Sequence, residues 1–203
     1  MNPFCSACGQ RTLLVHAGTK RVCPPTDGGI DRPACPVRVG VHNPAFPRTD
    51  PTVIMAIVNA AGTHVLLGHN KRWPKGFWSC LAGFCEPGES VEGAVRRETW
   101  EESGVRVGRV VLHSSQPWPY PACLMLGAVG EATGGEGEVV YLGHDEELED
   151  AKWVEIGEVR DALGKTGEEV LEGGEGELRL PPRTAIAHQL LLAVTKGWHK
   201  AKI

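Results

Sequence analysis

The chain has 203 residues, of which 41% are hydrophobic, and this is enough for one good core with a small additional module. Charged residues make up 23% and the formal net charge is −4, which argues against a general nucleic-acid or membrane surface. The seven cysteines, an odd number, exclude a fully paired disulfide framework and favour a reducing, intracellular compartment. No apolar run reaches the roughly 18 residues of a membrane-spanning helix.

Residues 1–48 hold four of the cysteines among many prolines and glycines, and they show no clear helical or strand period. A segment of this composition buries little apolar area, so something else must hold it together. Cys5 and Cys8 form a C-x2-C pair that can bind one Zn²⁺, and Cys23 and Cys35 follow as a second pair. The pattern predicts a zinc site in this segment.

The second pair is unusually wide, because compact zinc sites have paired ligands only a few residues apart. His16 or His42 is therefore an alternative to Cys35 as the fourth ligand. Four protein ligands leave no open coordination position, so the predicted zinc is structural rather than catalytic.

From residue 51 onward, strand and helix patterns alternate. Apolar runs predict strands over 52–59, 64–68, 77–84, 105–112 and 122–129. Residues 90–104 are typical of a helix that begins after the N-cap Ser90 and ends at Gly104, and 184–198 of a closing helix. Strands and helices that interleave around one core predict an α/β layered domain.

The predicted helix has an acidic face, because Glu98, Glu101 and Glu102 stand at positions i, i+3 and i+4. This face continues the apolar stripe of Val91 and Val95, so a solvated face relieved by the two neighbouring arginines explains it less well. Neighbouring like charges cost about 0.2–0.5 kcal/mol per pair unless a cation is present. Carboxylates that hold divalent ions suit attack on phosphorus, because the ions polarise the phosphoryl oxygen and activate water.

In the stretch SQPWPYP, residues 115–121, three prolines alternate with Gln116, Trp118 and Tyr120. On an extended strand the prolines share the opposite side and stiffen the backbone. Stacking of a base on an aromatic side chain is worth about 1–3 kcal/mol, so the aromatic side suits a nucleobase or nicotinamide ring. A proline-rich partner motif, a protected edge strand and plain core packing are the alternatives, and each explains only part of the pattern.

The stretch from Gly83 to Val105 resembles the Nudix box. Gly83 is followed after five residues by Glu89 and after seven more by RETWEESGV, which begins at Arg97. Nudix hydrolases cleave a nucleoside diphosphate linked to another group and use Mg²⁺ or Mn²⁺. The resemblance therefore implies their α/β/α sandwich with a mixed sheet. One position departs from the box, since Thr99 stands where a bulky aliphatic residue is usual.

The resemblance also implies roles for individual residues. Glu98 and Glu102 are similar to the main metal ligands, and Glu101 to the supporting ligand or base. The carbonyl of Ala82 often completes the metal site in this family, and Arg97 would orient a glutamate. Two or three catalytic ions are expected, and the glutamate that activates water differs among Nudix enzymes.

SQPWPYPAC resembles the S-Q-P-W-P-x-P-x-S signature of the NADH pyrophosphatase branch of Nudix hydrolases, with Cys123 in place of the last serine. The residues that would contact substrate in this signature are Gln116, Pro117, Trp118, Pro119, Tyr120, Pro121, Ala122 and Cys123. Phe46 and Ala187 are similar to further substrate contacts. Glu147 is similar to a further metal ligand, with a solvated acidic loop as the alternative.

This branch carries a four-cysteine zinc module directly before the Nudix domain, which implies a ribbon-like module over 1–48 and a hydrolase domain over 49–203. Members usually carry another N-terminal domain, so we expect the chain to be a fragment or a short form. Members are commonly homodimers, and Phe46 would then serve a partner's site. The last residues, 201–203, form Ala-Lys-Ile, a loose variant of the peroxisomal S-K-L address, with an arbitrary tail as the alternative. We expect a cytoplasmic or peroxisomal protein.

The resemblance implies Mg²⁺-dependent hydrolysis of the pyrophosphate of NADH or NAD⁺ to NMNH or NMN plus AMP. The same chemistry could remove NAD caps from RNA, and the sequence does not rank these substrates. ADP-ribose or another nucleoside diphosphate is a weaker alternative, because the proline-aromatic signature disfavours it. An inactive zinc-ribbon binding scaffold is weaker still, because the box retains its glutamates.

Overall fold

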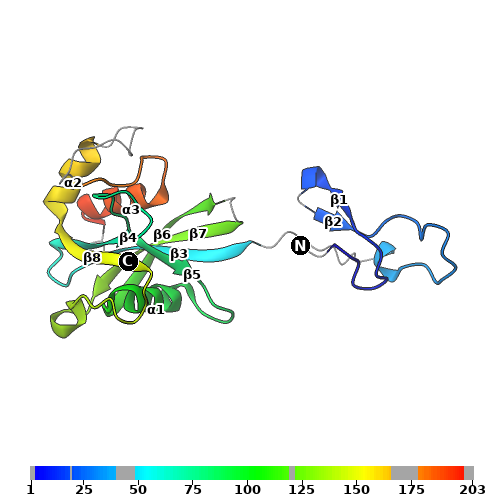
Figure 1. Ribbon diagram of the computed structural model, residues 1–203, viewed down its shortest axis with the longest axis horizontal. Helices are drawn as coiled ribbons and strands as arrows, with labels where there is room; N and C mark the ends of the chain where they lie inside the picture. Colours follow the sequence, from blue (N-terminus) through cyan, green and yellow to red (C-terminus); the bar gives the residue numbers. More distant parts are fainter. Residues whose placement is uncertain (1–2, 19, 40–48, 119–121, 166–177, 199–203) are drawn as a thin grey trace. The chain divides into compact units, whose positions relative to one another are not determined.

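The computed structural model describes residues 3–18, 20–39, 49–118, 122–165 and 178–198. The chain divides into two compact units, Met1–Thr49 and Asp50–Ile203 (Figure 1). Phe46, three residues of the aromatic signature (Pro119, Tyr120 and Pro121) and the C-terminal Ala-Lys-Ile lie outside the described residues.

The first unit is built around a short hairpin. β1 (Leu13–Val15) pairs antiparallel with β2 (Lys20–Val22), and a 3-10 turn over His16–Gly18 connects them. A second 3-10 turn covers Pro36–Arg38. Strands of three residues are too short to produce a recognisable alternation, which is why the sequence pattern predicts none here.

The second unit contains a six-stranded mixed sheet with the order β6-β7-β3-β4-β8, in which β5 also pairs with β3. β3 and β7 run parallel, and the other neighbours are antiparallel. The strands are β3 (Asp50–Val58), β4 (His64–Asn70), β5 (Leu81–Phe84), β6 (Val107–Trp118), β7 (Cys123–Ala132) and β8 (Leu148–Glu155).

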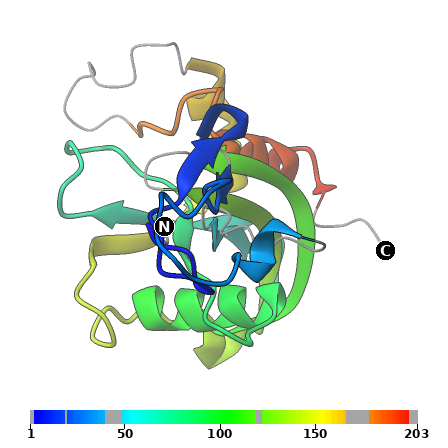
Figure 2. The ribbon, with the colours of Figure 1, turned by 90° about the vertical axis from the view of Figure 1, so that its right-hand side faces the viewer.

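Helices cover both faces of this sheet. α1 (Val91–Ser103) lies on one face, and α2 (Ile156–Lys165) and α3 (Ile186–Thr195) lie on the other (Figures 1 and 2). Alternate residues of β3 therefore enter two separate cores. Val53, Met55 and Ile57 pack with α1, whereas Ile54, Ala56 and Val58 pack with α2 and α3. The predicted α/β/α sandwich with a mixed sheet is confirmed.

The predicted ends of α1 are also confirmed. The Ser90 side chain accepts a hydrogen bond of 3.1 Å from the backbone N–H of Gly93, which satisfies one free donor of the first turn. Gly104 ends the helix with a left-handed φ of 72°, a conformation that glycine adopts without strain.

β4 and β5 share one edge of β3. β4 pairs with the second half of β3, at Ile57 and Val58, and β5 pairs with its first half, from Thr52 to Met55. β4 thus leaves β3 halfway along, and a single bridge between Gly68 and Ser79 connects it to the segment before β5. The residues that line the candidate site lie around this divergence.

Candidate active site

Among the described residues of the second unit, the most deeply buried carboxylate is that of Glu102, near the end of α1. Its side chain is only 4% exposed, yet its Oε1 has no hydrogen-bond partner. Burial raises the pKa of Glu102 to about 9, and the carboxylates of Glu147 and Glu98 add to this effect. A backbone hydrogen bond from Ala82 opposes the shift only in part. None of the ion pairs that residues of α1 form among the described residues involves Glu102.

Glu98 lies one turn earlier and packs directly against β5. A Cβ atom at position 83 would come within 1.9 Å of the Glu98 carboxyl carbon, so only glycine leaves room for this carboxylate. The Glu98 carboxylate thus occupies the space that a side chain at position 83 would need.

Arg97 holds the outer carboxylates of the helix. Its Nη1 donates to Glu98 and to Glu101, at 2.9 Å in both cases. Its Nε and Nη2 donate to the two oxygens of Glu89, also at 2.9 Å, and Nη2 reaches the carbonyl of Phe84. These hydrogen bonds, first those to Glu89, raise the pKa of Arg97. The guanidinium thus fixes Glu98 and Glu101 in place, as the sequence predicts for one glutamate.

Glu147, from the segment before β8, lines the same cavity as Glu102. Its Oε1 accepts a long hydrogen bond of 3.5 Å from Asn70, and its backbone N–H donates to Asp145. The structure therefore brings Glu147 to the carboxylates of α1, which weighs against a purely solvated acidic loop.

The acidic side chains lie near one another, but their oxygen atoms do not form a tight metal-binding cluster. Among the described residues, only four cysteines have all their ligand atoms within 4.8 Å of one another. Mutual repulsion between carboxylates accounts for a looser arrangement, and Mg²⁺ commonly keeps several waters that can span such gaps.

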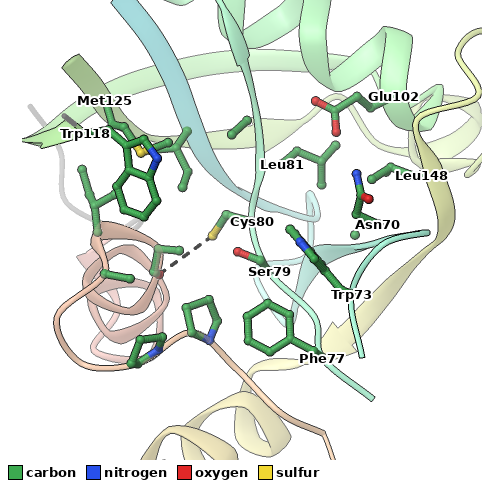
Figure 3. Close-up of a pocket in the computed structure, with 18 of the residues that line it drawn as sticks. Asn70, Trp73, Phe77, Ser79, Cys80, Leu81, Glu102, Trp118, Met125 and Leu148 are labelled. Carbon is green, nitrogen blue, oxygen red and sulfur yellow. Dashed lines mark hydrogen bonds between the residues drawn. The ribbon is translucent and has the colours of Figure 1, made fainter. Parts of the chain in front are cut away.

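A cavity of about 380 Å³ opens beside these carboxylates. Trp118 and Met125 lie on one side and Trp73 and Phe77 on the other, with Glu102 near the upper edge in the view of Figure 3. The volume is within the range of small-molecule sites, and such sites combine apolar walls with a few polar groups.

Trp118 is the described residue of the aromatic signature that lines this cavity. Gln116 does not line it, because its amide is used elsewhere. Its Nε2 donates to the carbonyl of Thr184, and its Oε1 accepts from the N–H of Ile186, each at 2.8 Å. These bonds fix the segment that leads into α3, and Ala187 of that helix does line the cavity.

The other described residues of the signature lie beside Trp118 without lining the cavity. Pro117 pairs with Leu124 and Trp118 with Cys123 across β6 and β7. Cys123 is buried and Ala122 is exposed. β6 is an edge strand, where a missing N–H removes no inner ladder bond, so the edge position explains why Pro117 is tolerated.

The first unit brings four sulfur atoms together, those of Cys5, Cys8, Cys23 and Cys35. Two separations are 3.9 Å (Cys5 to Cys35) and 3.5 Å (Cys8 to Cys23). A tetrahedron with Zn–S bonds of about 2.3 Å has S–S edges of about 3.8 Å, so the group fits one zinc ion. Disulfides would require about 2.05 Å, and all four cysteines are free.

Cys35 rather than His16 completes this group, and His42 lies outside the described residues. A carboxylate explains how the wide spacing closes. Asp27 accepts hydrogen bonds from Arg32 and Arg38, and these arginines also bond the carbonyls of Cys8 and Pro24. The segment between the last two cysteines is thereby folded back onto the first two.

Comparison with known families and structures agrees with this geometry. The NUDIX domain family matches residues 48–172, more than half of the chain. The chain belongs to the Nudix family. Ahead of the Nudix domain, the NADH pyrophosphatase zinc ribbon domain matches residues 2–27, so this match ends before Cys35.

Curated relatives extend the Nudix assignment. The NAD-capped RNA hydrolase NUDT12 of Macaca fascicularis is 46% identical over 93% of this chain, which spans 37% of that protein. The mitochondrial NAD(P)H pyrophosphatase NUDT13 of Mus musculus is 38% identical over 93% of this chain and 49% of that one. The chain therefore spans half or less of the relatives it matches here.

A solved Nudix hydrolase from Nitrosomonas europaea has the same fold, with a TM-score of 0.55 at 20% identity over 98% of this chain and 93% of that one. Nudix hydrolases use divalent metals, in line with the gathered carboxylates. No helix among the described residues is long and apolar enough to cross a membrane.

Sequence reasoning missed one wall of the Nudix cavity. Asn70, Trp73 and Phe77 line it, and Asp145 contributes to the raised pKa of Glu102. The available signal was the segment NKRWPKGF, residues 70–77, in which cations and aromatics alternate between two predicted strands.

Proposed function

We propose that this chain hydrolyses the pyrophosphate of NADH and NAD⁺ to NMNH or NMN plus AMP. The observation that carries the proposal is the buried carboxylate of Glu102, whose Oε1 has no hydrogen-bond partner, at the edge of a cavity that Trp118 lines. The Glu102 carboxylate would serve a metal-bound phosphate, and Trp118 would stack on a flat ring. The activities for which NUDT12 and NUDT13 are named support the same substrate class.

The residues present fit divalent cations. A cation would satisfy the free Oε1 of Glu102 and offset the repulsion from neighbouring carboxylates. The residues that would hold Mg²⁺ or Mn²⁺ are Glu98, Glu101, Glu102, Glu147 and the carbonyl of Ala82. When bound, two or three such ions supply Lewis-acid polarisation of the pyrophosphate oxygens.

The chain's own residues prepare the reaction. Arg97 orients Glu98 and Glu101, which leaves their remaining oxygens free to accept hydrogen bonds. Glu102 must lose its proton before a cation binds. A water attacks one phosphorus, the bond to the bridging oxygen breaks, and the second mononucleotide leaves. The proton of the water passes to a carboxylate of the group, and Glu101, the most exposed member that Arg97 holds, is our candidate.

The specificity of the reaction is assigned to the cavity. Trp118 is placed to stack on a ring, and Gln116 and Ala187 position the wall opposite β5. Phe46 and Tyr120, with Pro119 and Pro121, are proposed to complete the ring site. Cys123 would replace the hydrogen bond of the usual serine by a weaker one.

We further propose that residues 1–48 form a structural zinc module and residues 49–203 the hydrolase domain. Five large apolar side chains of the first unit are exposed: Phe4, Leu13, Leu14, Ile30 and Val39. Such exposure suits a partner surface, and we propose a homodimer in which Phe46 serves the partner's site. The C-terminal Ala-Lys-Ile is proposed as a peroxisomal address.

Removal of NAD caps from RNA is a second candidate. It is favoured by the similarity to the NAD-capped RNA hydrolase NUDT12 and by exposed cations beside the cavity, at Arg72 and Lys75. Both reactions break the same pyrophosphate, so they differ only in the chain that follows the leaving nucleotide.

The test compares rates on NADH, NAD⁺, ADP-ribose and NAD-capped RNA with Mg²⁺, for the wild type and Trp118→Ala. Stacking is worth about 1–3 kcal/mol, so we expect a loss of about 5- to 150-fold on the substrates that carry nicotinamide and a smaller loss on ADP-ribose. Tyr141→Ala, which removes an exposed aromatic outside the cavity, is the matched control. Equal losses on all four substrates would refute the assignment of Trp118.

A further inference from the structure

The loop between β4 and β5 carries a concentration of positive charge that is unusual for this acidic chain. Lys71, Arg72 and Lys75 are all exposed, and Trp73 between them is 36% exposed. The chain as a whole has a formal net charge of −4. The loop is therefore a local cationic and aromatic surface.

The base of the loop is fixed to its surroundings. The Lys71 ammonium donates to the carbonyl of Glu146, and the backbone N–H groups of Arg72 and Trp73 donate to Asn70. At the other end, Phe77 forms a β-bridge with Arg179. The loop consequently presents its outer side chains on an anchored backbone.

The outer cations are unused within the described part of the chain. No carboxylate there forms an ion pair with Arg72 or Lys75, whereas Arg32, Arg38, Arg97 and Arg109 each hold one. Two unpaired cations on either side of an exposed indole suit a ligand with phosphates and stacked bases.

This surface is continuous with the candidate active site. Trp73 and Phe77 line the cavity, and their rings meet edge to face with centroids 5.2 Å apart. Figure 3 shows Trp73 on the side of the cavity away from Trp118, with Glu102 above Trp73 at the upper edge. A pyrophosphate held at Glu102 and Glu147 with one ring at Trp118 therefore directs its second nucleotide toward Trp73.

We propose that residues 71–77 bind the single-stranded RNA that follows a dinucleotide cap. Trp73 stacks on a base beyond the cleaved pyrophosphate, and Arg72 and Lys75 pair with the phosphates of the following nucleotides. This inference rests on the second candidate of the proposed function and names the residues that would hold the RNA beside the same site.

The test measures kcat/KM on NADH and on a short NAD-capped RNA over a series of salt concentrations. The variant is Arg72→Gln with Lys75→Gln. The matched control, Arg106→Gln with Lys196→Gln, removes two exposed cations that do not line the cavity. Thermal unfolding shows that each variant is folded.

Each phosphate contact to a single strand contributes about 0.7 to the slope of log affinity against log salt, so loss of two flattens the slope by about 1.4. Over a tenfold rise in salt, capped RNA then loses about 25-fold less of its kcat/KM with the variant than with the wild type. On NADH, which carries no following phosphates, the slopes of variant and wild type should agree. Trp73→Ala should lower kcat/KM by about 5- to 150-fold on capped RNA and on NADH alike, because both carry a base directly beyond the pyrophosphate, and Trp73→Phe should restore most of it.

Three outcomes are contrary, and they separate the RNA surface from the proposed function. If the wild type hydrolyses neither substrate, the proposed function fails. If it hydrolyses both, but the variant and the control retain the wild-type salt slope on capped RNA, the RNA surface is refuted while the proposed function stands. Equal flattening on NADH and on RNA would also refute it, because the loop would then act on the dinucleotide or its acidic surroundings.

Discussion

Replacement of Glu102 by glutamine tests the central feature of the site, a buried carboxyl that holds a proton when no cation is present. The pKa of Glu102 is about 9 in the folded chain, against an ordinary value of 4.5. Between these values the folded state binds a proton that the unfolded state releases. The free energy of unfolding of the metal-free protein must therefore fall as pH rises through this range.

The size of the effect follows from the proton count. One proton changes the free energy of unfolding by about 1.4 kcal/mol per pH unit, so the wild type loses up to about 2.7 kcal/mol between pH 6 and pH 8. For a domain of this size the melting temperature falls by about 5–10 °C. Glu102→Gln carries no charge in either state, so it should lack this contribution.

The assay is thermal unfolding followed by tryptophan fluorescence, with a chelator and then with Mg²⁺. All six tryptophans lie in Asp50–Ile203, so the signal reports this unit without the zinc module. Metal binding requires a deprotonated carboxyl, so the stabilisation by Mg²⁺ should be larger at pH 8 than at pH 6 in the wild type. Turnover of Glu102→Gln should fall by orders of magnitude with the fold retained.

The matched control is Glu155→Gln, which neutralises an exposed glutamate of β8 and should keep the wild-type pH slope. Equal pH slopes for the wild type and Glu102→Gln would show that Glu102 is not the protonated, buried group described here. Near-normal turnover of Glu102→Gln would refute its place in a metal site.

Two further substitutions test the supports of each unit. Gly83→Ala places a Cβ atom 1.9 Å from the Glu98 carboxyl carbon, so it should displace this carboxylate. Turnover should fall at least tenfold, which corresponds to about 1.4 kcal/mol, and the melting temperature should be nearly unchanged. Unchanged kinetics would contradict the close packing. Asp27→Asn weakens the ion pairs with Arg32 and Arg38, so zinc should be lost at a lower chelator concentration. A colorimetric zinc indicator measures this loss. The control Asp31→Asn, which changes an exposed aspartate, should behave as the wild type. Equal chelator sensitivity of both variants would contradict the role of Asp27.

The sequence anticipates those parts of the fold in which local pattern and tertiary structure agree. α1 is one such case, because Ser90 and Gly104 provide the end signals and the apolar stripe supplies the buried face. β3 is another, since seven consecutive buried residues reflect helices on both sides of the sheet. Both elements contribute side chains to the candidate site, Ile54 from β3 and Glu102 from α1.

β8 and α2 were not anticipated. β8 carries charged residues on its exposed side and follows an acidic run, so its alternation is easily taken for a polar loop. α2 begins directly after it, with two buried residues, Val159 and Leu163, as its inward contacts. The predicted strand over 77–84 is also shorter in the structure, because Phe77 and Ser79 form only isolated bridges and the ladder begins at Leu81.

Contacts between distant segments limit what the sequence can predict about the site. Gln116 reads as a ligand contact in sequence, but only the fold shows its amide bonded to residues 68 and 70 positions away. Likewise, nothing local to Asn70 or Trp73 reveals that they face the carboxylate of Glu102 across the cavity. Such roles depend on tertiary placement, which strand and helix periods do not encode.

The division of charge around α1 explains how this site can be both stable and ready for cations. Arg97 is bonded to Glu89, Glu98 and Glu101, so one guanidinium offsets part of the charge of the outer carboxylates and fixes their positions. Glu102 and Glu147 are not bonded to it, and Glu102 avoids their mutual repulsion through its raised pKa. A divalent cation would replace the Glu102 proton and bring two positive charges to a carboxylate that Arg97 does not contact. Arg97 therefore leaves the negative charges of Glu102 and Glu147 uncompensated. Because both carboxylates line the cavity, cation binding and pyrophosphate binding would depend on each other.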